Sequence, residues 1–237
     1  MSRRADTSLQ AANSVLRSVL LRLTGAPPKS GLGQIIQITS ASSSTGTSYI
    51  ASNLAFLAAT DFCPHAGRIG LFDCDFARLA QTGYFFSTQK AQSMSGPYDA
   101  LFGQSGFWTV SNPLGHQRDI NDLCAIYIDE STGLAVSTLF MDRMAYDERA
   151  YIRHWPEYWQ ALRSQFSLIF IDAPALDRSQ DSLTLAPICD STILVADVNT
   201  PNDALNRQAR DAIVNVGGRY GGLLMNTRSP AALTPLR

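Results

Sequence analysis

A stretch of small residues near the start of the chain has the spacing of a phosphate-binding loop. Residues 34–59 read QIIQITSASSSTGTSYIASNLAFLAA, which predicts a short strand over Ile35–Thr39, then a loop, then an amphipathic helix. In that order, backbone N–H groups and a helix N-terminus face an anion. The fixed places of the P-loop motif G-x-x-x-x-G-K-[ST] fall on Ala41, Gly46, Thr47 and Ser48. The sequence therefore predicts a nucleotide site in which threonine stands where a lysine should bind the β- and γ-phosphates.

Carboxylates end two of the apolar runs that follow this loop. The run RIGLFDCD ends in Asp73 and Asp75, which a strand would direct to the same side, and LIFID ends in Asp172. Open α/β sheets bind ligands at the carboxyl ends of their strands, and Mg²⁺ bound to phosphates takes oxygen ligands. The acids predict a magnesium site, with Asp172 in the Walker B position and Arg78 within reach of it. The alternative for Asp73 or Asp75 is that it caps the next helix.

The elements that must position these residues alternate between strand and helix. Beyond Asp172, the run STILVADV predicts a buried strand, Thr200 and Pro201 predict the start of a helix that ends near Val216, and GGLLMN predicts a strand that ends at Asn226. Such alternation makes a parallel, doubly wound sheet. We therefore expect an α/β fold in three layers, with a mainly parallel, P-loop NTPase-like sheet flanked by helices.

The middle of the chain carries weaker signals. Residues 89–115 are rich in Ser, Gly and Gln, and GPYDALFGQ within them reads as a short helix between loops. Ile126–Ile128 and Leu134–Leu139 are candidate strands. Tyr146–Phe166 reads as one helix with an aromatic face, interrupted by Pro156. An aromatic face of this kind more often packs in a core than binds a base.

An amphipathic helix is expected before the phosphate loop. Within Met1–Gly25, Thr7 or Ser8 can cap a helix whose apolar residues recur at helical spacing. Packing on the chain's own core is the main interpretation, and docking to a neighbouring subunit or lying on an anionic membrane surface are the alternatives. We divide the chain into an N-terminal helix and linker, 1–33, and a single P-loop NTPase-like domain, 34–237.

Composition excludes some classes of function. The chain has 237 residues with 19 basic and 20 acidic side chains, a net charge of −1 that gives no basic field for nucleic acid. Its apolar runs are too short to span a membrane, and no secretory leader opens it. The four cysteines are Cys63, Cys74, Cys124 and Cys189, and they form no C-x-x-C pair. This spacing favours buried, reduced thiols and a cytoplasmic protein. If the chain works at a membrane, a partner brings it there.

Taken in order, the motifs resemble those of the bacterial tyrosine-kinase (BY-kinase) domains of polysaccharide co-polymerase systems, within the P-loop group that includes the MinD and ParA type ATPases. The resemblance covers nearly the whole chain from Ser8 onward and is carried by QITSASSSTGTSYIASNLA, IGLFDCDFARLA, GPYDALFG, LIFIDAPAL, SLTLAPICDSTILVADV and GGLLMN. It implies that Asp73, Asp75, Asp172 and Ser48 surround Mg²⁺ and that Asn226 lies near the base.

Pattern and resemblance together give a set of candidate site residues. The candidate nucleotide contacts are Ser42, Ser43, Ser44, Thr45, Gly46, Thr47, Ser48, Tyr49, Arg78 and Asn226. The candidate metal ligands are Ser48, Asp73 and Asp172, and in an active enzyme the catalytic residues would be Asp73, Asp75 and Asp172. The candidate cofactors are ATP or ADP with Mg²⁺.

Three departures from the family pattern bear on activity. Ser44 and Thr47 stand where the family has glycine and lysine. The serine costs about 1 kcal/mol if its φ must be positive. The loss of the lysine removes a charge-assisted hydrogen bond of about 1.5–3 kcal/mol. No tyrosine follows Tyr220, although the family phosphorylates a C-terminal tyrosine cluster. Of the family's oligomerising Glu-x-x-Arg-x-x-Arg helix, the chain keeps only the last arginine, Arg17.

These departures favour a catalytically impaired, kinase-like partner that regulates or scaffolds a membrane complex for exopolysaccharide or capsule synthesis and export. Its expected partner is a membrane polysaccharide co-polymerase (Wzz-like) that recruits it to the inner membrane, and self-association stays open. The alternative is an active ATPase or atypical tyrosine kinase in which an arginine, from Arg78, Arg68 or a neighbouring subunit, replaces the lost lysine. A MinD-like spatial regulator ranks last.

Overall fold

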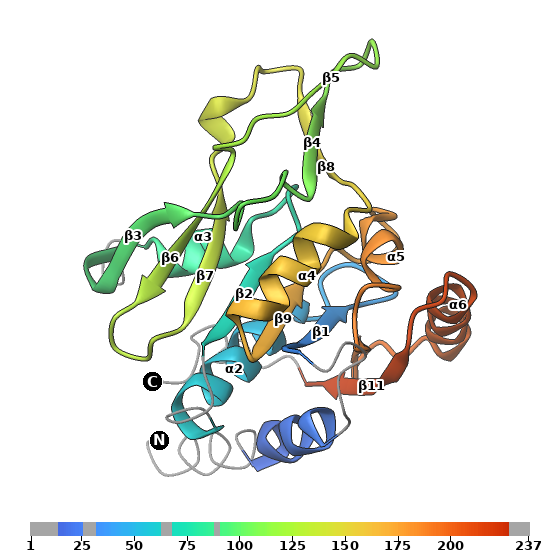
Figure 1. Cartoon of the computed structure of the whole chain (residues 1–237). Coiled ribbons are helices and arrows are strands. Elements are labelled where there is room, and N and C mark those ends of the chain that lie inside the picture. The colour runs from blue at the N-terminus through green and yellow to red at the C-terminus, as the bar shows by residue number, and fades with distance from the viewer. Residues whose placement is uncertain (1–13, 26–31, 63–67, 88–90, 228–237) are drawn as a thin grey trace.

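The computed structural model describes residues 14–25, 32–62, 68–87 and 91–227. An eight-stranded sheet runs through the molecule in the order β11-β10-β1-β9-β2-β7-β6-β3 (Figure 1). Its strands are β1 (Gln34–Thr39), β2 (Ile69–Asp73), β3 (Met94–Asp99), β6 (Cys124–Asp129), β7 (Ala135–Leu139), β9 (Leu168–Asp172), β10 (Ser191–Asp197) and β11 (Tyr220–Asn226). The sheet has helices on both faces, which confirms the expected three-layer α/β fold.

The parallel centre of this sheet positions the candidate site. Strands β1, β2, β9 and β10 are buried at every residue, because they are apolar runs with helices on both faces. Alternate residues of β1 serve opposite layers: Ile35 faces the cluster around Trp159, and Ile36 faces the cluster around Leu54. All pairings from β11 to β7 are parallel, so the carboxyl ends of these strands lie along one edge.

The middle of the chain forms antiparallel structure that the sequence pattern reveals only in part. Strand β6 pairs antiparallel with β7, and β3 pairs antiparallel with β6 at the edge of the main sheet. A second, three-stranded antiparallel sheet projects from the top of the molecule in Figure 1; it consists of β4 (Trp108–Ser111), β5 (Gln117–Arg118) and β8 (Arg149–Ile152). The short helix expected in GPYDALFGQ is wrong, because Met94–Asp99 is a strand and the next residues form turns. The expected strands at 126–128 and 134–139 are confirmed.

Three helices follow on one face of the sheet: α4 (Pro156–Gln165), α5 (Asp181–Leu185) and α6 (Asp203–Asn215). The single helix expected over Tyr146–Phe166 is wrong in its first half, because β8 occupies Arg149–Ile152 and the proline is the first residue of α4, where its missing N–H costs nothing. Tyr158 and Trp159 lie in the core, as expected. Asn202, rather than Thr200, caps α6 by accepting a hydrogen bond from Leu205 N.

The opposite face carries α2 (Thr47–Leu57), its π-helical continuation (Ala58–Phe62) and α3 (Ala80–Phe85). A helix over 14–24 packs on the same cluster through Leu16, Leu20 and Leu23, which confirms the chain's own core as its partner over these residues. The expected caps at Thr7 and Ser8 and the cysteine at 63 lie outside the described residues. Cys74, Cys124 and Cys189 are buried thiols, as expected. Within the described part of the chain, no helix is long and apolar enough to cross a membrane.

A buried ion pair fixes the start of β1. Arg163 of α4 bonds the Asp190 carboxylate, and both side chains are almost fully buried. The guanidinium also donates to the carbonyls of Gly33 and Ile188, and Asp190 accepts from Ile35 N. Because the partners of Arg163 lie at the start of β1 and just before β10, this network ties α4, β1 and the entry to β10 together.

Candidate active site

The loop between β1 and α2 has the backbone of a phosphate loop. Gly46, just before the first residue of α2, has φ 90°, and Ser44 has φ 68°. The serine therefore adopts the left-handed conformation that glycine favours, as the sequence predicted, at a cost of about 1 kcal/mol. Thr47 begins α2, so an uncharged hydroxyl stands at the place of the motif's lysine.

Asn226, at the end of β11, packs against this loop. Its Nδ2 donates to Thr45 O at 2.9 Å, and a Cβ added at Gly46 would lie 2.2 Å from that nitrogen. Glycine at 46 is thus required both by its positive φ and by the close approach of Asn226. The amide nitrogen of Asn226 serves the loop backbone, and its expected contact with a base stays a prediction.

Two of the predicted acids lie side by side on neighbouring strands. Asp73 of β2 is the register partner of Asp172 of β9, and both are buried. Gln81 of α3 connects them: its backbone N–H donates to Asp73 Oδ2 at 3.0 Å, and its side-chain amide donates to Asp172 Oδ2 at 2.8 Å. The same amide donates to Ser48 O at 2.9 Å. A neutral side chain of the protein therefore occupies the space between the phosphate loop and both strand-end acids.

Asp73 also has the alternative role predicted for it, which is to cap the next helix. Its Oδ2 accepts from the backbone N–H groups of Gln81 and Thr82, which open α3, so this carboxylate caps the helix that follows. Burial, together with the neighbouring Asp172 charge, raises the pKa of Asp73 well above its usual range. A raised pKa favours the neutral form of Asp73, which lowers the negative charge that a metal ion would meet.

Asp172 is poorly solvated. Burial raises its pKa to about 7, although hydrogen bonds from the side chains of Ser48 and Gln81 oppose the rise. Its Oδ1 is buried and has no hydrogen-bond partner. Such an orphaned oxygen beside the Ser48 hydroxyl fits Mg²⁺, which would supply positive charge to a phosphate held on the loop. Among the described residues, no group of three or more His, Cys, Asp or Glu side chains could hold a metal ion, so phosphate oxygens would have to complete the coordination.

Asp75 turns away from this pair. It follows the end of β2, and both of its carboxylate oxygens bind the guanidinium of Arg178, Oδ1 at 2.8 Å from Nη1. The adjacent Asp177 binds the phosphate loop, with Oδ2 accepting from Ser43 N at 2.8 Å and Oδ1 accepting from Ser43 Oγ at 2.8 Å. The loop's donors thus already hold a carboxylate of the same chain.

The structure brings some predicted residues together and separates others. Residues 42–48, with the three aspartates and Asn226, lie around one loop. Arg78 is exposed, and Arg68 precedes β2 at the end of the strand opposite to the acids. Sequence reasoning missed Gln81, Asp177 and Arg178. The last two follow the Walker B strand closely, but no spacing rule assigned them a role.

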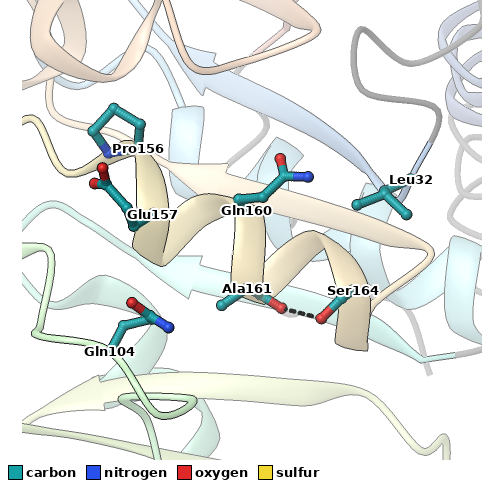
Figure 2. A pocket seen from close by; sticks show the side chains of 7 residues that line it. All are labelled: Leu32, Gln104, Pro156, Glu157, Gln160, Ala161 and Ser164. Carbon is teal, nitrogen blue, oxygen red and sulfur yellow. Dashed lines mark hydrogen bonds between the residues drawn. The ribbon is translucent and has the colours of Figure 1, made fainter.

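A separate depression lies along the outer surface of α4. It has a volume of about 670 Å³ and is lined mainly by uncharged side chains, with Gln160 and Ala161 on the helix and Gln104 on a facing loop. Figure 2 shows these side chains around an open surface, with Glu157 as the charged member. The depression shares no residue with the phosphate loop or the acid pair, so it is not the nucleotide cleft.

Comparison with solved structures places the fold among kinase domains. The VpsO kinase domain aligns with 96% of this chain over 100% of its own length, at 20% identity and a TM-score of 0.64. The kinase domain of the Escherichia coli tyrosine kinase ETK covers 86% of the chain over 71% of its own length, at 16% identity and a TM-score of 0.52. The Aquifex aeolicus MinD cell division protein covers 83% of the chain over 70% of its own length, at 13% identity and a TM-score of 0.50.

No protein-family model and no curated protein matches the chain. The structural likenesses agree with the resemblance read from the motifs, to bacterial tyrosine kinases within the MinD and ParA group. At these identities they show the fold alone: the chain has a P-loop NTPase-like α/β fold that it shares with these kinase domains.

Proposed function

We propose that this chain is a catalytically impaired tyrosine-kinase-like protein that acts by binding, as a regulatory or scaffolding partner of a membrane complex for polysaccharide synthesis and export. The kinase-like fold supports the first half of the proposal. The polysaccharide setting and the expected partner, a membrane polysaccharide co-polymerase, rest on the resemblance of the motifs. The chain would reach the inner membrane through that partner.

The observation that carries the proposal is the charge around the phosphate loop. Thr47 stands in place of the lysine, and the Arg178 guanidinium already binds both carboxylate oxygens of Asp75. Asp177 adds a carboxylate directly on the loop. A triphosphate entering this site meets the carboxyl groups of Asp73, Asp172 and Asp177. Transition-state charge on the transferred phosphoryl group finds no free cation among the described side chains that bind the loop or the acids.

One observation favours a second function, an active ATPase or atypical tyrosine kinase. The candidate ligands Ser48, Asp73 and Asp172 are all present, the two acids are register partners on neighbouring strands, and the buried Asp172 Oδ1 has no hydrogen-bond partner. In that case Arg178 would have to leave Asp75 to reach a γ-phosphate, or a neighbouring subunit would have to supply an arginine.

A complementation experiment separates the two functions. In a host deleted for the gene that encodes this chain, we expect polysaccharide output to fall and to be restored equally by the wild type and by Asp172→Asn, because binding does not need the metal ligand. Asp203→Asn, an exposed acid at the start of α6, is the matched control for loss of one charge. Restoration by Asp203→Asn but not by Asp172→Asn, at equal protein levels, would establish the enzyme instead.

A further inference from the structure

The segment that follows the Walker B strand lies against the phosphate loop. After β9 the chain runs through Pro174 to Arg178. Two hydrogen bonds to the backbone of this segment hold it in place: Leu176 N donates to Ser40 O at 2.9 Å, and Thr39 Oγ1 donates to Pro174 O at 2.7 Å. The segment is therefore fixed against the end of β1, where the phosphate loop begins. The side chains of Asp177 and Arg178, which follow, bind the phosphate loop and Asp75, respectively.

Asp177 makes the contacts that a phosphate oxygen would make. One carboxylate oxygen takes the backbone N–H of Ser43 and the other takes its hydroxyl, both at 2.8 Å. Backbone N–H groups of such a loop are the donors that bind phosphate. The carboxylate thus fills one of the loop's anion-binding positions and sets a negative charge beside the rest. Because Asp177 is exposed, it can exchange this contact for water without unfolding the core.

Arg178 holds the segment on the other side. Its guanidinium binds Asp75 in a two-pronged arrangement, and this pair is largely buried, with side-chain exposures of 24% for the arginine and 7% for the aspartate. Two-pronged arginine–carboxylate pairs fix geometry as well as charge. The carboxylate on the loop and the guanidinium on the acid belong to adjacent residues, so each contact restrains the other.

We infer that Asp177 and Arg178 form an autoinhibitory latch, in which the chain's own carboxylate fills the phosphate loop and the neighbouring arginine keeps it there. Release of Asp177 then opens an anion site for the phosphate chain of a nucleotide. The inference rests on the proposed function, because a chain that no longer turns over ATP can keep its phosphate loop filled. It adds a means by which the occupied and open loop could present different surfaces to a partner.

The test compares two variants that lose the same charge. Binding of inorganic triphosphate with Mg²⁺ is measured by calorimetry for the wild type, Asp177→Asn and Asp203→Asn. We expect the affinity to rise at least tenfold in Asp177→Asn and to stay at the wild-type value in Asp203→Asn, because only the first variant removes a charge from the loop. Equal affinities in the two variants would overturn the latch.

Hydrogen exchange gives an independent readout. The amide of Ser43 should exchange faster in Asp177→Asn than in the wild type, and Mg-triphosphate should restore its protection in the variant. Unchanged exchange at Ser43 would also overturn the latch, whatever the calorimetry shows. Turnover of ATP by the wild type would contradict the proposed function, whereas the latch depends on the ratio between the two variants, so the two failures are distinguishable.

Discussion

Replacement of the buried acid Asp172 by asparagine should stabilise the fold, and by an amount that depends on pH. The Asp172 carboxyl has a pKa of about 7 in the folded protein because it is buried, and one of its oxygens has no partner. An ordinary aspartate in the unfolded chain titrates near pH 4, at about 3.9. The folded state therefore binds the proton more strongly, and ionisation of Asp172 opposes folding.

The sign of the effect follows from that difference. The stability associated with protonated Asp172 is fully present below about pH 4 and is lost as pH rises through 7. About three pKa units correspond to about 4 kcal/mol, which is an upper bound because Asp73 titrates in the same pair. Asparagine keeps a carbonyl that can accept from Gln81 and carries no charge. We expect Asp172→Asn to gain about 1–3 kcal/mol at pH 8 and close to nothing at pH 4.5.

Urea unfolding at the two pH values, followed by the fluorescence of the buried Trp108 and Trp159, measures this gain. The matched control is Asp190→Asn, because Asp190 is equally buried but bonds Arg163. That variant should be destabilised at both pH values. If Asp172→Asn loses the same free energy at pH 8 as at pH 4.5, Asp172 is a satisfied structural acid and the reasoning on its burial is refuted.

Two further predictions concern the loop and the network behind it. Gly46→Ala should lower the free energy of unfolding in urea by about 2 kcal/mol or more, since its Cβ would meet Asn226 at a positive φ. Gly83→Ala, in α3 with open space around it, should leave that free energy unchanged or raise it by up to about 1 kcal/mol. Equal effects of the two substitutions would count against the loop geometry. Arg163→Met should cost about 3–5 kcal/mol because it leaves the buried Asp190 charge without the guanidinium that neutralises it. The double variant with Asp190→Asn should recover part of that loss, and an additive loss would contradict the pairing.

The sequence predicts the central sheet well because its strands leave a strong local signal. Buried parallel strands are continuous apolar runs, and Asp73 and Asp172 stand directly at their ends. Their neighbourhood follows from the topology of a parallel sheet, in which strand ends share an edge. The left-handed backbone at Ser44 is expected from the resemblance, because the family has glycine at this position of the loop.

The antiparallel part of the chain lacks such a signal. Strand β3 has no alternation of buried and exposed residues, so a helix seemed as reasonable over Gly96–Asp99. β8 is four residues long and lies just before Pro156. Because Tyr151 of β8 is close in sequence to the aromatic residues of α4, the sequence pattern predicts one helix over both elements. Short edge strands of this kind depend on their pairing partners more than on their own residues.

The side chains that bind the phosphate loop and the strand-end acids could not be predicted, because their partners are distant in sequence. Arg178 lies 103 residues from Asp75, and Asp177 lies 134 residues from Ser43. Gln81 is a neutral amide with no motif, yet it joins the phosphate loop to Asp172, 91 residues away. Nothing local in the sequence distinguishes these residues from ordinary loop and helix positions, whereas Arg78, which looked better placed, is exposed.

The central claim is that this phosphate loop no longer supports turnover of a nucleotide. Phosphate release from Mg-ATP, compared between the wild type and Asp172→Asn at equal concentration, tests it most directly. We expect the two proteins to release phosphate at the same background rate. Saturable release by the wild type that Asp172→Asn abolishes would show that a working site survives without the lysine at position 47.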